Sequence, residues 1–262
     1  GAALAAGAMR LANSRPAAPA LPPLARPAPG SAIDCATLAG RQPLTLLVIG
    51  QSNAGNHGAP GPAGTPAVPV IHGDGCYLAR GPLPGATGSG GSPWPWLAGA
   101  LGDRPVVLAV VAAESTAIAQ WLGDTPLHRE LAERVASMHR LGFRIDAVLW
   151  QQGEADMLAG TSAADYESRL LALRAGLHAL DVHAPLIAAR STYCKGHPGA
   201  AVREAIEHAA RSRSDIVLGP DTDRLQGDER QDGCHFSAHG LQAAASLWAD
   251  TLVRLRLAGA TR

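Results

Sequence analysis

Short apolar runs alternate along this chain with longer stretches in which apolar residues recur at helical spacing. Five runs have the length and composition of buried strands: 44–49, 106–112, 145–150, 185–189 and 216–218. Four stretches have the periodicity of amphipathic helices: 127–141, 166–180, 200–211 and 241–257. Because right-handed crossovers place helices on both faces of a parallel sheet, this order predicts an α/β fold, a three-layer α/β/α sandwich around about five parallel strands.

Two segments fall outside this alternation. Residues 1–34 begin with Ala, Pro, Gly and Arg, a composition that buries too little apolar area to offset the entropy lost on ordering, so we expect a flexible tether before one domain over 35–262. The first eight residues are either the remnant of an export signal or a chance feature of an Ala-rich chain. Residues 56–95 are rich in Gly and Pro with little periodicity, which predicts a long loop that helps to shape a binding site.

Charge and hydropathy exclude several classes of partner. The chain has 22 basic and 22 acidic residues, scattered singly, so no field would gather nucleic acid or anionic lipid, and a neutral or small substrate is favoured. Pro and Gly interrupt every apolar run before the ~20 residues of a membrane span. The glycines of 88–91 follow no expected strand and precede no suitably placed Lys or Thr, so they do not indicate a nucleotide site.

A hydroxyl follows the first expected strand, in the sequence Gly50-Gln51-Ser52-Asn53. In open α/β sheets the carboxyl ends of the strands are where loops and helix N-termini meet ligands, so Ser52 is a candidate nucleophile. The alternative is a helix N-cap, a position that serine commonly fills. A nucleophilic serine also needs a base.

Asp232 precedes His235 by three residues, between the last expected strand and the last expected helix. One turn can hold both side chains, so the carboxylate can orient the imidazole while its second nitrogen takes a proton from Ser52. A turn-capping pair without catalytic function is the alternative. His239 has no third ligand nearby in the sequence, and no metal or other cofactor is expected.

Further polar groups follow the second and third expected strands. Gln152 can direct its side-chain amide into the site, and the backbone N–H groups of Ser52 and Ser115 lie at the same edge, so the three form a candidate oxyanion hole. Glu154 is either a second acid for His235 or a structural carboxylate, and we favour the structural role.

These segments together resemble the SGNH/GDSL hydrolase superfamily, and within it the sialate O-acetylesterase-like group that includes carbohydrate esterase family six. The resemblance runs from Leu44 to the end of the chain and includes Gly-Gln-Ser-Asn, Trp-x-Gln-Gly-Glu and Asp-Gly-x-His in the family's order. It implies a Ser52, Asp232 and His235 triad, Gln152 as oxyanion donor, and Gln51, Asn53 and Glu154 as neighbouring support.

One turn departs from the family pattern. Relatives usually carry Gly-Gly-Thr-Ser where this chain has Glu114-Ser115-Thr116-Ala117. The backbone donor survives at Ser115, but its larger side chain disfavours the dihedrals open to glycine. Glu114 also brings a carboxylate near the oxyanion, where it would repel developing charge unless it is directed away or protonated.

The sequence therefore predicts a metal-independent serine esterase that removes short acyl groups, most often acetyl as the resemblance implies, from carbohydrate hydroxyls. Two alternatives remain: an O-acetyltransferase that uses the same triad on polysaccharides, and a catalytically silent carbohydrate-binding domain. The tether and the even number of cysteines suggest a secreted or periplasmic protein. Cys194–Cys234 is the first candidate disulfide, because both residues lie in segments beside the expected site, and Cys35–Cys76 is the second.

Overall fold

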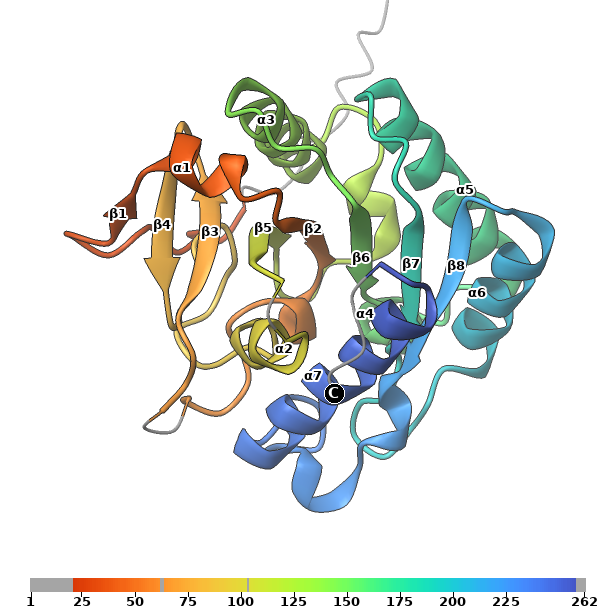
Figure 1. The fold of residues 1–262 in the computed structure, drawn as a ribbon. Coiled ribbons are helices and arrows are strands. Elements are labelled where there is room, and N and C mark those ends of the chain that lie inside the picture. The colour runs from red at the N-terminus through yellow and green to blue at the C-terminus, as the bar shows by residue number, and fades with distance from the viewer. Residues whose placement is uncertain (1–20, 62–63, 103, 258–262) are drawn as a thin grey trace, which may run out of the picture.

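The computed structural model describes residues 21–61, 64–102 and 104–257. In these residues an eight-stranded sheet lies between two layers of helices, in the order β1-β4-β3-β5-β2-β6-β7-β8 (Figure 1). The strands in chain order are β1 (Ala32–Ile33), β2 (Leu44–Gly50), β3 (Val68–His72), β4 (Gly75–Ala79), β5 (Val106–Ala112), β6 (Ala147–Gln151), β7 (Leu186–Arg190) and β8 (Ile216–Asp221).

The five expected strands are confirmed as β2, β5, β6, β7 and β8, and every pairing among them is parallel. At the carboxyl end of β2, Gly50 pairs with Ala112 of β5 on one side and with Gln151 of β6 on the other. The residues that follow these three strands therefore emerge side by side at one edge of the sheet, where the sequence places the candidate nucleophile and oxyanion donors.

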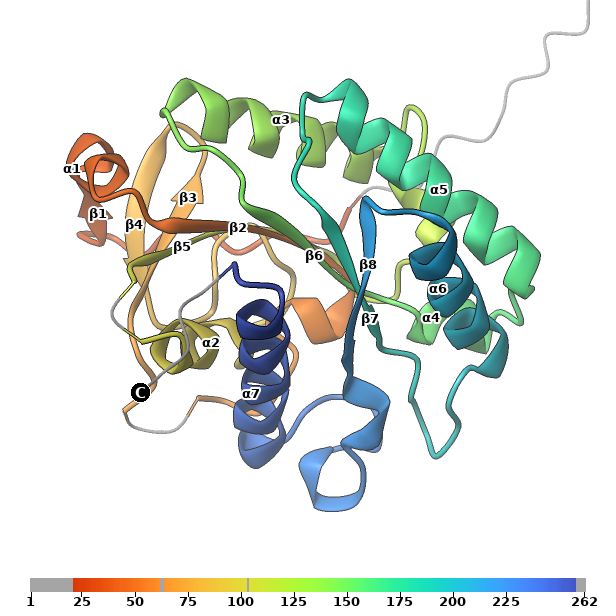
Figure 2. The same ribbon diagram turned by 45° about the vertical axis from the view of Figure 1, so that its right-hand side comes forward.

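The helices cover the two faces unequally (Figure 2). Four helices pack on one face: α1 (Cys35–Gly40), α3 (Pro126–Arg140), α5 (Ala163–Ala179) and α6 (Ala200–Ser212). On the opposite face lie α2 (Trp94–Ala100) and α7 (Ala238–Arg254). Short turns of helix line the carboxyl edge or its loops, namely η1 (Ser52–Ala54), η2 (Ile118–Trp121), α4 (Glu154–Leu158), η3 (Thr222–Arg224) and η4 (Gly227–Glu229).

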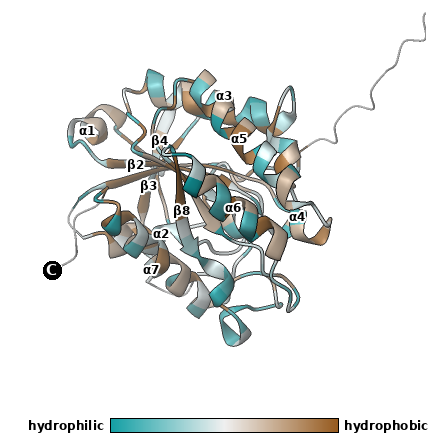
Figure 3. Ribbon diagram, turned by 90° about the vertical axis from the view of Figure 1, so that its right-hand side faces the viewer, coloured by the Kyte–Doolittle hydropathy of each residue, from teal (hydrophilic) through white to brown (hydrophobic). Residues whose placement is uncertain are grey.

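Two apolar clusters hold these layers together. Successive residues of β2 alternate between them, with Leu47 and Ile49 in the larger cluster and Leu46 and Val48 in the smaller. Both faces of the strand are thus buried, which explains its uninterrupted apolar sequence. Coloured by hydropathy, the strands form an apolar centre and the helices turn hydrophilic residues outward (Figure 3). None of the helices in the described parts of the chain is long and apolar enough to cross a membrane.

The expected loop over 56–95 is only partly a loop. Residues 68–79 form the antiparallel pair of β3 and β4, and β3 extends the sheet by pairing with β5 in parallel. The strands are five residues each, Pro69 interrupts the first, and a glycine-rich turn joins them, so neither gives a long apolar run. The expectation of a long loop without strands is therefore wrong for this hairpin.

The expected tether begins outside the described residues, and for 1–20 it stays a prediction. From Leu21 onward the chain contacts the domain: Ala25 exchanges backbone hydrogen bonds with Gly85 and Ala86, and β1 pairs with β4. Residues in 21–34 therefore pack on the domain, and its boundary at residue 35 stays a prediction.

Candidate active site

The turn that carries Ser52 depends on a close approach between two strands. Gly50 has φ +149°, and a Cβ at this position would lie 2.1 Å from the backbone oxygen of Gln151. Only glycine therefore lets β2 end this close to β6. Ser52 follows as the first residue of η1 and is 4% exposed, so its hydroxyl lies at the carboxyl edge of the sheet.

The neighbours of Ser52 tie this turn to two other segments. The Gln51 Oε1 accepts the backbone N–H groups of Gly153 (3.4 Å) and Ala155 (3.0 Å). Asn53 donates through Nδ2 to Glu154 Oε1 (2.6 Å) and to the backbone oxygen of Cys234 (3.2 Å). The nucleophile turn is thus fixed to the end of β6 and to the loop that carries His235.

Asp232 and His235 form the expected pair. The His235 Nδ1 lies 2.7 Å from Asp232 Oδ2, while Asp232 Oδ1 accepts the backbone N–H groups of Cys234 (2.9 Å) and His235 (2.7 Å). Partial burial opposes ionisation, but these hydrogen bonds hold the pKa of Asp232 below its ordinary value. An ionised Asp232 keeps the proton on Nδ1 and leaves Nε2 able to accept one.

The loop that holds this pair is cross-linked. Both expected disulfides, Cys194–Cys234 and Cys35–Cys76, are present. Arg230 adds a hydrogen bond of 2.6 Å to the backbone oxygen of Cys234. The residue that precedes His235 is therefore held by a covalent bond and by a guanidinium.

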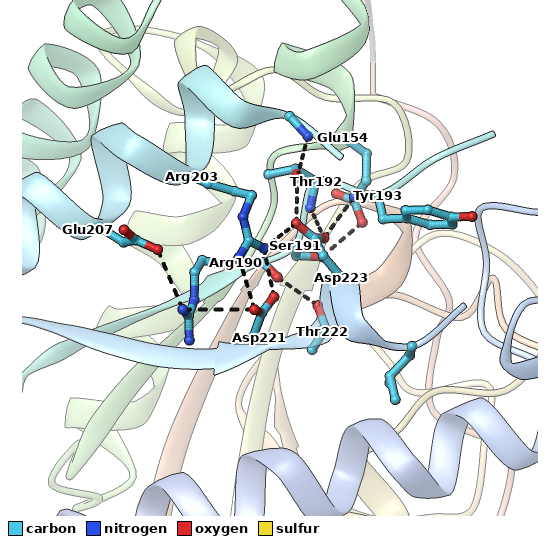
Figure 4. Close-up of polar contacts among 12 residues, drawn as sticks. Glu154, Arg190, Ser191, Thr192, Tyr193, Arg203, Glu207, Asp221, Thr222 and Asp223 are labelled. Carbon is cyan, nitrogen blue, oxygen red and sulfur yellow. Dashed lines mark hydrogen bonds and ion pairs between the residues drawn. The ribbon is translucent and has the colours of Figure 1, made fainter. Parts of the chain in front are cut away.

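A buried ionic network positions the other side of the disulfide (Figure 4). Asp223 accepts the backbone N–H groups of Thr192 (2.6 Å) and Tyr193 (2.8 Å), and Arg203 donates to the same carboxylate at 2.7 Å. These contacts fix the backbone immediately before Cys194. The sequence analysis missed this network because it joins residues of β7, α6 and η3 that are far apart in the chain.

The structure brings the segments of the proposed triad together. Asn53 bonds to Cys234, and the ring of His57 stacks on that of His235 with centroids 5.6 Å apart. Ser52 immediately precedes Asn53 in the chain and lies five residues before His57. Within the described residues no hydrogen bond joins Ser52 Oγ to His235, so their catalytic partnership stays a prediction.

Ser115 and Glu114 occupy the turn that departs from the family pattern. Ser115 has φ +56°, in the left-handed region that favours glycine, the residue that the resemblance places here. Its N–H stays a predicted oxyanion donor. The Glu114 side chain is 46% exposed, and its Oε2 lies 3.8 Å from His57 Nδ1, so the carboxylate is directed toward His57.

Gln152 is fully buried and its amide is already engaged. Its Nε2 donates to the backbone oxygen of Thr116 (3.0 Å) and to Asp156 Oδ2 (2.6 Å), and its Oε1 accepts the Tyr166 hydroxyl (2.8 Å). The opposite amide orientation would turn Oε1 toward two acceptors, so the orientation is well determined. A role for Gln152 as oxyanion donor stays a prediction, and it requires that one of these two bonds be given up.

Glu154 lies beneath the nucleophile turn, 1% exposed. Its Oε1 accepts hydrogen bonds from Asn53 (2.6 Å) and from Ser191 Oγ (2.9 Å), whereas Oε2 has no partner among the described residues. Burial raises the pKa of Glu154 to about 7, against the lowering effect of those hydrogen bonds. The contact of His235 is with Asp232, so this arrangement fits the structural role for Glu154.

The sequence alone does not indicate His57, one of two histidines in the segment expected to be a loop, and its contact with His235 reveals it. In the part of the chain that the structure describes, no group of three or more His, Cys, Asp or Glu side chains gathers as a metal site.

The sequence over residues 96–254 matches the family described as carbohydrate esterase, sialic acid-specific acetylesterase. This match covers more than half of the 262 residues. The chain belongs to this family of carbohydrate esterases. It is a carboxylic ester hydrolase. The matched residues include Ser115, Gln152, Asp232 and His235 and begin after Ser52.

Solved structures share the fold of this esterase. A protein from Arabidopsis thaliana is 22% identical with a TM-score of 0.70, and the alignment covers 81% of this chain and 98% of that one. NanS is 15% identical with a TM-score of 0.58, over 81% and 97% of the two chains. A family 3 carbohydrate esterase from Clostridium thermocellum is 14% identical with a TM-score of 0.53, over 83% and 100%. A comparison with curated proteins gives no match.

Proposed function

We propose that this esterase removes acetyl groups from carbohydrate hydroxyls, with Ser52 as nucleophile, His235 as general base and Asp232 as the group that orients it. The observation that carries the proposal is the 2.7 Å contact between Asp232 and the Nδ1 of His235, in a loop bonded to the turn that bears Ser52. This contact supports His235 as a base, because it favours the tautomer whose Nε2 can accept the proton of a serine hydroxyl.

The reaction proceeds in two halves. Ser52 Oγ attacks the ester carbonyl carbon while His235 Nε2 takes the hydroxyl proton, giving a tetrahedral oxyanion. When this intermediate collapses, the bond to the sugar oxygen breaks, and the imidazolium returns its proton to the departing hydroxyl. Water then attacks the acetyl-Ser52 with His235 again as base, and acetate leaves as Ser52 recovers its proton.

Backbone N–H groups of Ser52 and Ser115 would bind the oxyanion, with Gln152 as the predicted third donor. Each such donor typically contributes about 3 kcal/mol to transition-state stabilisation. Gln51 and Asn53 support the site by holding the nucleophile turn on β6 and on the Cys234 loop.

A cavity of about 420 Å³ lies beside the segment that follows the nucleophile turn, and we propose that it receives the sugar. Gly90 and Gly91 line it, and both pair through the backbone with the residues that flank His57. Arg80 also lines the cavity, is exposed, and forms no ion pair with a described residue. Its guanidinium is suited to sugar oxygens and to a carboxylate such as that of sialic acid, which the family description names.

The two disulfides also bear on the compartment in which we propose that the protein works. Two disulfides persist in an oxidising environment, which supports a secreted or periplasmic location. Mass mapping under non-reducing conditions of the protein isolated from its source would contradict this location if all four cysteines carried free thiols.

The experiment that tests the function is hydrolysis of p-nitrophenyl acetate and of longer acyl esters by the intact chain and by Ser52→Ala, with a metal chelator present. We expect acetate turnover that Ser52→Ala abolishes and that falls with acyl length, followed by release of acetate from acetylated sialic acid or acetylated xylan. Turnover that is unchanged in Ser52→Ala would refute the assigned nucleophile.

A further inference from the structure

His57 lies five residues after Ser52 and is largely buried, with its side chain 14% exposed. Its ring stacks on His235 at 5.6 Å between centroids and 29° between planes. Its Nε2 lies 2.9 Å from Thr87 Oγ1, and its Nδ1 lies 3.8 Å from Glu114 Oε2. The His57 ring thus contacts His235, the predicted base. It also lies near the carboxylate of Glu114, a residue that departs from the family pattern next to the predicted oxyanion donor Ser115.

The hydrogen bonds are compatible with a neutral imidazole that carries its proton on Nδ1. Thr87 Oγ1 accepts the backbone N–H of Glu114 at 2.9 Å, and its own hydrogen is available for donation to His57 Nε2. In that tautomer the N–H of the ring is on the nitrogen nearest the Glu114 carboxylate. Burial and the neighbouring His235 lower the pKa of His57, while Glu114 raises it, and the net result lies below the ordinary value.

The position of His57 bears on the charge repulsion that the Glu114 carboxylate would exert on the oxyanion. A carboxylate one residue before Ser115 opposes the charge that forms when the ester carbonyl becomes an oxyanion. In this chain the same carboxylate lies beside the imidazole of His57, whose Nδ1 is 3.8 Å from its Oε2.

We propose that His57 is a positioning residue, which holds the Glu114 carboxylate away from the oxyanion and packs against the catalytic imidazole. The inference rests on the proposed function. A neutral His57 also suits its neighbour, because His235 becomes positively charged when it takes the serine proton, and a second charge 5.6 Å away would oppose that step.

Groups from three segments face His57. Glu114 follows β5, Thr87 comes from the stretch between β4 and α2, and His235, with Asp232, comes from the loop before α7. A fourth contact reaches its backbone, where Gln231 Nε2 donates to the His57 oxygen at 2.9 Å. The ring therefore has both nitrogens and one face engaged by the active site.

A double-mutant cycle tests the proposal. His57→Phe keeps a ring against His235 but cannot bind a carboxylate, so it should lower kcat for p-nitrophenyl acetate by roughly tenfold, the effect of a like charge several ångströms away near a protein surface. Glu114→Gln alone should change kcat by less than about threefold, because its charge is already held aside. In His57→Phe/Glu114→Gln, kcat should recover to within about threefold of Glu114→Gln.

A double variant whose kcat is no higher than that of His57→Phe would overturn the proposal. If His57 were merely structural, Glu114→Gln would not restore the kcat that His57→Phe loses. As a matched control, Glu204→Gln on the exposed surface of α6 should not rescue His57→Phe.

A second measurement separates this inference from the proposed function. NMR titration of the imidazole C–H resonances in Ser52→Ala needs no turnover, and there Glu114→Gln should lower the pKa of His57 because a charge that raises it is lost. An unchanged His57 pKa would overturn the inference even if the chain hydrolyses no ester. Turnover that does not depend on Ser52 would instead refute the proposed function.

Discussion

Replacement of Glu154 by glutamine should stabilise the protein in a strongly pH-dependent way. The carboxyl is buried, one of its oxygens has no partner among the residues that the structure describes, and its pKa is raised to about 7 from the ordinary value of 4.5. That difference corresponds to about 3 kcal/mol of unfolding free energy. Glutamine keeps an oxygen for Asn53 and Ser191 and cannot ionise, so it removes the pH-dependent cost, and any cost of burying its NH2 group is the same at every pH.

The sign follows from proton binding. Below pH 4.5 the carboxyl is protonated in both states and contributes nothing. Between pH 4.5 and 7 the unfolded chain loses its proton first, so the stability of the parent protein falls as the pH rises, and above pH 7 the full cost of about 3 kcal/mol remains. Glu154→Gln should therefore be more stable than the parent by less than about 1 kcal/mol at pH 5 and by about 3 kcal/mol at pH 8.5.

The assay is urea unfolding followed by tryptophan fluorescence at pH 5, 6, 7 and 8.5, with the disulfides intact. Glu204→Gln, at an exposed position of α6, is the matched control and should show no pH-dependent difference. A Glu154→Gln difference that stays constant across these pH values would refute the reasoning, because a buried ionising carboxyl must give a difference that grows with pH.

Four further outcomes are expected. Asp232→Asn should lower kcat for acetyl esters by ~10³-fold or more with its fold intact by circular dichroism, whereas a loss of less than tenfold would argue against an orienting carboxylate. Ser115→Gly relieves a left-handed backbone and should raise the unfolding free energy by about 1 kcal/mol in urea titrations, and an equal loss would contradict the strain. Arg80→Ala should raise KM for acetylated sialic acid roughly tenfold while KM for p-nitrophenyl acetate stays constant, and parallel changes would place the sugar elsewhere. Replacing Cys194 and Cys234 by Ser should cost up to ~4 kcal/mol in thermal or urea unfolding, since the bond closes a loop with a sequence separation of 40, and an unchanged midpoint would contradict this.

The parallel core could be predicted because each strand is buried on both faces and so reads as an apolar run of β-branched and aliphatic residues. The hairpin of β3 and β4 could not, since Pro69 and the adjacent glycines remove that pattern while pairing with β5 and β1 supplies the hydrogen bonds. Tertiary pairing here overrides a weak local preference.

The candidate site also contains residues that the sequence predicts and residues that it does not. Ser52, Asp232 and His235 follow strands or precede a helix in short motifs, so position along the chain predicts them as candidates. His57 and Asp223 have no motif, and their significance lies in contacts with residues tens to more than a hundred positions away. Spacing also could not show that the amide of Gln152 is already committed to Thr116 and Asp156.

The Cys194–Cys234 disulfide beside His235 bears on the stage at which the enzyme becomes active. The nucleophile turn is made by the first parallel strand, whereas the base comes from the final part of the chain and is fastened through Cys234 to the segment after β7. In a chain whose cysteines are reduced, we expect hydrogen bonds such as those of Asn53 and Arg230 to be what holds the loop of His235. Under the proposed triad and the proposed location, oxidation would therefore act as a maturation step that confines full ester hydrolysis to a compartment where disulfides form.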